Sequence, residues 1–78
     1  MKTQAPMDKP YYKTIKLQGI DFRFRITTTQ LESGTIVFCW SLENPYGEGT
    51  LEEDTSWSAE ELGEDLQASA KFALRRLS

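Results

Sequence analysis

Residues 11–29 read YYKTIKLQGIDFRFRITTT, and this stretch decides the fold of the chain. Two runs rich in aromatic and β-branched residues flank Gln18-Gly19, a two-residue loop with glycine second, which is typical of a β-hairpin. Such a loop pairs Leu17 with Ile20 and fixes every later pair. The predicted register places the large apolar side chains of both runs on one face of the hairpin: Ile15, Leu17, Ile20, Phe22, Phe24 and Ile26.

The other face of the predicted hairpin is polar and basic. Lys16 lies opposite Asp21 as a cross-strand ion pair, and Tyr12 lies opposite Arg25, where ring and guanidinium can stack. Single-stranded nucleic-acid binders use such groups for base stacking and phosphate contact, but an ordinary solvated face, and after it a protein contact, is the commoner explanation of such a face. The candidate binding face comprises Tyr12, Lys16, Arg23, Arg25 and, from the next strand, Val37.

The rest of the chain predicts two more strands and one helix. TIVFCWSL (35–42) is apolar on both faces, which is typical of a central strand. Asn44-Pro45-Tyr46-Gly47 matches a type I turn, and a short, charged edge strand is expected to follow at about 48–53. SAEE (58–61) is a capping box ahead of an apolar stripe, which predicts a helix over 59–77. The predicted fold is α+β: an antiparallel three- to four-stranded β-meander packed on one C-terminal helix (β-β-β-(β)-α).

Two positions within the predicted helix stand out from its regular pattern. Gly63 flanks the apolar stripe, and a close approach of the helix to the sheet explains a glycine there. Phe72 also lies on the flank of the stripe, by the 3.6-residue period. We expect Phe72 to be either covered by the N-terminal segment or a candidate flank contact for a partner.

Length and composition limit the chain to one small domain. Its 78 residues suffice for one domain, and the proline- and lysine-containing residues 1–10 predict a disordered tail ahead of a single domain at 11–78. Cys39 is the only cysteine, and a lone thiol suits a reducing compartment. Because neither an apolar leader nor a membrane-length apolar run is present, we expect a cytoplasmic location without membrane association.

The charged and nucleophilic residues do not predict catalysis. Histidine is absent, which removes the commonest general base and metal ligand, so we expect no catalytic residues, no metal and no cofactor. Charge is divided unevenly, with a net +3 over residues 1–40 and −6 over residues 41–78. The acidic half suggests a second candidate surface for a partner. It comprises Glu48, Glu52, Glu53 and Asp54.

These observations favour a small non-enzymatic protein-interaction domain, such as a bacterial or phage regulator or inhibitor that acts by binding a protein partner. The alternative is a nucleic-acid-binding module that uses the basic and aromatic sheet face. The residues do not identify the partner or the biological process. They also leave open which of the two surfaces binds it, and whether the chain forms a homodimer.

Overall fold

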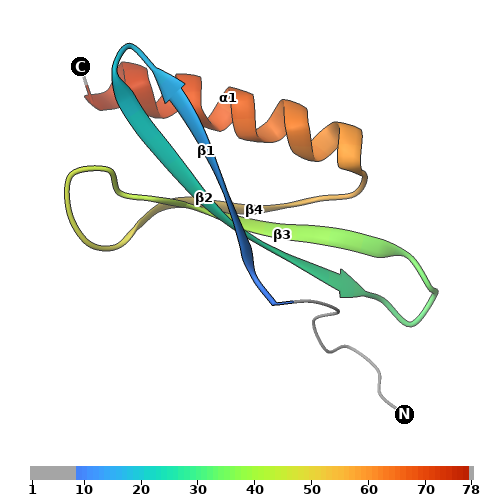
Figure 1. Ribbon diagram of the computed structural model, residues 1–78. Helices are drawn as coiled ribbons and strands as arrows, with labels where there is room; N and C mark the ends of the chain where they lie inside the picture. Colours follow the sequence, from blue (N-terminus) through green and yellow to red (C-terminus); the bar gives the residue numbers. More distant parts are fainter. Residues whose placement is uncertain (1–8, 78) are drawn as a thin grey trace.

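The computed structural model describes residues 9–77 and contains one sheet and one helix (Figure 1). Its elements are β1 (Tyr11–Leu17), β2 (Ile20–Gln30), β3 (Ile36–Glu43), β4 (Thr50–Ser56) and α1 (Ala59–Leu77). The strands form an antiparallel sheet in the order β1-β2-β3-β4, and α1 lies across one face of it. The predicted α+β meander is therefore confirmed, with the fourth strand present. Residues 1–8 of the predicted tail lie outside the described residues.

The register of β1 against β2 is the one that the Gln18-Gly19 loop predicts. Leu17 pairs with Ile20, and the pairing continues to Tyr11 opposite Ile26. Gln18 has φ 50° and Gly19 has φ 80°. Positive φ at both central residues is what a type I′ turn requires, and this turn matches the right-handed twist of the flanking strands.

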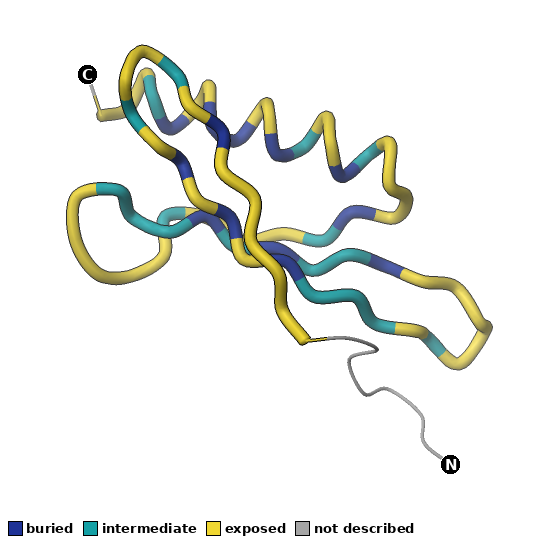
Figure 2. The backbone as a smooth tube through the Cα atoms, viewed as in Figure 1, coloured by how far each residue is buried: buried dark blue, intermediate teal, exposed yellow. Residues whose placement is uncertain are grey.

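The core lies between α1 and the sheet face that it covers (Figure 2). Phe24 and Trp40 contact edge to face, with ring centroids 5.7 Å apart and planes inclined by 72°. From the apolar stripe of the helix, Leu62, Leu66, Ala70 and Ala73 are buried. Ser69 is buried as well, whereas Ala59 and Leu77 at the two helix ends are exposed. One apolar stripe of α1 is thus sufficient to close the sheet face.

The start of α1 is fixed by side-chain caps. The Glu61 N–H donates to Ser58 Oγ over 3.0 Å, which is the predicted N-cap bond. Glu61 Oε1 accepts from the Trp57 N–H over 3.1 Å, one residue earlier than in a standard capping box. Within residues 9–77, no helix is long and apolar enough to cross a membrane.

Two local expectations are wrong. A Cβ built on Gly63 meets nothing within 4 Å, because Leu62 and Leu66 face the sheet and Gly63 projects toward solvent instead. The last strand begins at Thr50 rather than near 48. The turn is closed by Gly47 N–H to Asn44 O (3.4 Å), and Asn44 N–H bonds Gly49 O (3.0 Å), so the loop continues through residue 49.

Candidate functional site

The open face of the sheet, opposite α1, holds the predicted aromatic and basic side chains. Tyr12 pairs directly with Arg25, as predicted, but its ring stacks under the guanidinium of Arg23, 3.9 Å from the ring centroid. The expected stacking of Tyr12 with Arg25 is therefore wrong. Strand twist accounts for the difference, since it brings a diagonal neighbour over the ring in place of the direct one.

Carboxylates neutralise most of the positive charge on the open face. Lys16 Nζ lies 3.7 Å from Asp21 Oδ1, which confirms the predicted cross-strand ion pair, and Arg23 Nη1 lies 3.7 Å from Glu43 Oε1. Arg25 has no ion pair within residues 9–77, although it lines a shallow depression together with Glu53. This face therefore offers a phosphate backbone little unpaired positive charge.

Val37 does not contribute exposed surface to the open face. It pairs with Thr29 and is 4 % exposed, so the expectation of an exposed apolar side chain there is wrong. Its backbone pairs with β2 on one side, and the pairing of β3 with β4 begins one residue later, at Phe38.

The four predicted acidic residues do not form one surface. Glu48 lies in the loop before β4, and Glu53 pairs with Ser41 on the open face. Glu52 and Asp54 pair with Leu42 and Trp40, which places both carboxylates on the side that faces α1. Only Glu52 and Asp54 are thus brought together.

A β-bulge adds an apolar residue beside these two carboxylates. Leu42 pairs with Glu52 and Glu43 pairs with Thr50, so Leu51 has no partner residue on β3. An extra residue of this kind changes the direction of the side chains around it. As a result, Leu51 and Glu52 both line the space between β4 and α1.

Two sets of polar contacts hold α1 beside β4. Ser69 Oγ donates to Glu52 Oε1 over 2.6 Å. Trp40 Nε1 donates to Ser56 Oγ over 3.0 Å, and Ser56 Oγ donates in turn to Asp65 Oδ2 over 2.6 Å. Ser56 is fully buried and Trp40 is 4 % exposed, so this chain of hydrogen bonds satisfies two side chains that have little access to water.

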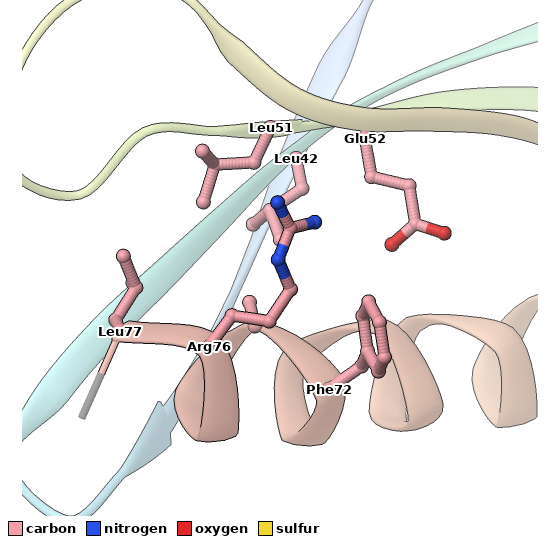
Figure 3. A pocket seen from close by; sticks show the side chains of 7 residues that line it. Leu42, Leu51, Glu52, Phe72, Arg76 and Leu77 are labelled. Atoms are coloured by element: carbon pink, nitrogen blue, oxygen red, sulfur yellow. The ribbon is translucent and has the colours of Figure 1, made fainter.

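An apolar notch of about 100 Å³ opens between β4 and the C-terminal end of α1 (Figure 3). Its apolar walls are Leu42, Leu51, Phe72, Ala73 and Leu77, with Glu52 and Arg76 also lining it. Figure 3 shows Arg76 extending from α1 toward β4, between Leu51 and Phe72. Phe72 is 48 % exposed, and the guanidinium carbons of Arg76 and Arg75 lie 5.6 and 6.0 Å from its ring centroid.

An acidic trough of about 460 Å³ adjoins the notch and shares Glu52 and Phe72 with it. Its other lining residues are Trp40, Asp54, Asp65, Ala68, Ser69 and Arg75. We refer to the notch and the trough together as the α1–β4 groove. Among residues 9–77, no three His, Cys, Asp or Glu side chains are placed to hold a metal ion.

The sequence pointed to part of this groove. The sequence predicts Phe72, Glu52 and Asp54 as candidate contacts, and the structure places all three at the groove. It did not single out Leu51, which the bulge turns inward, or Asp65, whose charge near the start of α1 is explained by the helix dipole alone.

Comparison of the chain with protein-family models, curated proteins and solved structures finds no match. What the groove does is therefore inferred from its geometry and chemistry.

Proposed function

We propose that this chain is a small non-enzymatic protein-interaction domain that binds a protein partner through the α1–β4 groove. The observation that carries the proposal is Phe72, which stands half exposed at an open apolar notch. Apolar surface of this kind, bordered by charged groups, is characteristic of protein-binding sites. The class of protein that we propose for this chain is a bacterial or phage regulator or inhibitor.

The composition of the groove supports a protein partner. Interface cores are enriched in aromatic residues and arginine, and the residues that dominate binding are often of these types. Phe72 lies about one helical turn before Arg75 and Arg76, and its ring is close to both guanidinium groups. This cluster combines an apolar anchor with charged groups that can pair at the rim of an interface.

The nucleic-acid alternative draws less support from the open sheet face. Two of its three cations, Lys16 and Arg23, are paired with carboxylates, and one face of the Tyr12 ring is already occupied by the Arg23 guanidinium. Nucleic-acid affinity comes mainly from cations that neutralise phosphates, and stacking requires an accessible ring. The open face supplies only Arg25 without such a partner among residues 9–77.

Affinity enrichment with matched baits tests the proposal. The baits are the wild-type chain, Phe72→Glu and the control Tyr46→Glu, whose ring is 65 % exposed in the loop before β4. We expect a protein that the wild type and Tyr46→Glu retain and Phe72→Glu loses. Equal far-ultraviolet circular dichroism spectra would show that both variants are folded. Equal retention of the partner by Phe72→Glu would contradict binding through the α1–β4 groove.

A further inference from the structure

The apolar notch and the acidic trough lie next to each other along the α1–β4 groove, and the separation between them is similar on the sheet side and on the helix side. On β3, the notch is lined by Leu42 and the trough by Trp40, a shift of two residues, or about 6.7 Å of strand. The helix residues that line the two spaces are centred about five residues apart, or about 7 Å of helix. Both walls therefore give the same spacing.

This spacing matches an extended peptide. Alternate residues of a strand lie about 6.7 Å apart and point to the same side. A segment that lies along β4 can therefore place one side chain in the notch and the side chain two residues away in the trough. Among residues 9–77, β4 is paired only with β3, so within this part of the chain its other edge is open to a fifth strand, and strand addition is a common mode of peptide recognition.

The lining of each space specifies the side chain that fits it. The notch is walled by Leu42, Leu51 and Leu77 and suits a bulky apolar group. The trough contains three carboxylates, Glu52, Asp54 and Asp65, against the single cation Arg75. The Ser69 hydroxyl donates to one carboxylate oxygen of Glu52, and the Ser56 hydroxyl donates to one carboxylate oxygen of Asp65. Within residues 9–77, the second oxygen of each carboxylate has no hydrogen bond. The trough therefore suits a lysine or an arginine.

We propose that the partner binds the α1–β4 groove as an extended segment in which a bulky apolar residue and a lysine or arginine stand two positions apart. This inference rests on the proposed function and names the chemistry of the partner. A second copy pairing through β4 fits the charges poorly, because Glu52, Glu53 and Asp54 would meet the same acidic residues across the interface.

Selection from a phage-displayed library of random peptides on the immobilised full chain tests the inference. We expect the selected sequences to share an apolar residue and, two positions away, a lysine or arginine. Replacing that cation by glutamine in a synthetic peptide should weaken its Kd about 2- to 5-fold, as loss of an exposed ion pair does.

A charge switch gives the sharper control. With Asp54→Lys as bait, the preference for lysine or arginine should be lost, because the trough then holds two carboxylates, Glu52 and Asp65, against two cations. Glu53→Lys changes the net charge by the same amount, but Glu53 lies on the opposite face of the sheet, so it should leave the selected sequences unchanged. An equal loss of the cation preference with both baits would mean that net charge, not the groove, selects the peptide, and would overturn the inference.

Three further outcomes distinguish a failure of this inference from a failure of the proposed function. Peptides that require Phe72 but show no cation at the two-residue spacing would overturn the inference and leave the proposed function standing. If no peptide binds the wild type better than the Phe72→Glu bait, both fail. A dimer in sedimentation equilibrium that Phe72→Glu dissociates would make a second copy the occupant and overturn the inference.

Discussion

Replacing Ser56 by alanine tests how α1 is held on the sheet. The Ser56 hydroxyl accepts from Trp40 Nε1 and donates to Asp65 Oδ2, and Ser56 is fully buried. The substitution leaves the Trp40 N–H without a partner, which costs about 1–3 kcal/mol for a buried group. It also removes a hydrogen bond to a carboxylate, worth about 1.5–3 kcal/mol, part of which water recovers at the partly exposed Asp65.

We therefore expect Ser56→Ala to lower the free energy of unfolding by about 2–4 kcal/mol. For a domain of this size that corresponds to a fall in Tm of roughly 10–30 °C. Urea denaturation followed by circular dichroism at 222 nm measures the change. Ser41→Ala is the matched control: Ser41 lies on β3 and is partly buried, its side chain makes no hydrogen bond within residues 9–77, and its substitution should change stability by less than about 0.5 kcal/mol.

A double-mutant cycle isolates the contact between strand and helix. Ser56→Ala and Asp65→Ala, measured singly and together, should show a coupling energy of about 0.5–3 kcal/mol, because the two side chains share a hydrogen bond. If Ser56→Ala costs no more than Ser41→Ala, or if the coupling is zero, then the hydrogen-bond chain does not hold α1 in place.

Four further tests address the fold and the surfaces. Gly63→Ala should raise the free energy of unfolding by about 0.5–1 kcal/mol, because its Cβ enters open space on a helix; a lower urea midpoint would contradict this. Ser58→Ala should lower the free energy of unfolding by about 0.5–2 kcal/mol through loss of the N-cap bond. An unchanged urea midpoint would mean that α1 does not need this cap. Phe22→Ala should lower the free energy of unfolding by about 3–5 kcal/mol in the same assay, whereas Arg23→Ala on the open face should lower it far less. Equal losses from the two substitutions would refute the assignment of Phe22 to the core face and Arg23 to the open face. Labelled single-stranded DNA and RNA should not bind the open face in fluorescence anisotropy titrations at low salt, and binding that Arg25→Glu weakens would revive the nucleic-acid alternative.

The sequence predicts the elements whose signals are local. The Gln18-Gly19 loop sets the register of β1 and β2, since a two-residue turn of this kind allows one pairing. Ser58 and Glu61 mark the start of α1 through bonds that span only a few residues. In both places, residues close in sequence determine the geometry.

The site depends on geometry that is not local. The faces of Glu52 and Glu53 depend on the register of β4, where a shift of one residue exchanges them, and the bulge at Leu51 is not readable from the residues. The contact between Ser56 and Asp65 requires α1 to be docked. The stacking of Arg23 on Tyr12 depends on strand twist. Phe72, Glu52 and Asp54 could be named from the sequence, but Leu51, Asp65 and the arrangement of the groove could not.

The strand order has a consequence for how the chain folds during synthesis. Because each strand pairs with the one before it, the sheet can form hairpin by hairpin as residues emerge from the ribosome. The face that carries Phe22, Phe24 and Leu42 has no cover until α1, the last element, is complete. During that interval the nascent sheet presents a bare apolar surface, which is prone to aggregation. A truncation that removes α1 leaves this apolar face of the sheet permanently exposed.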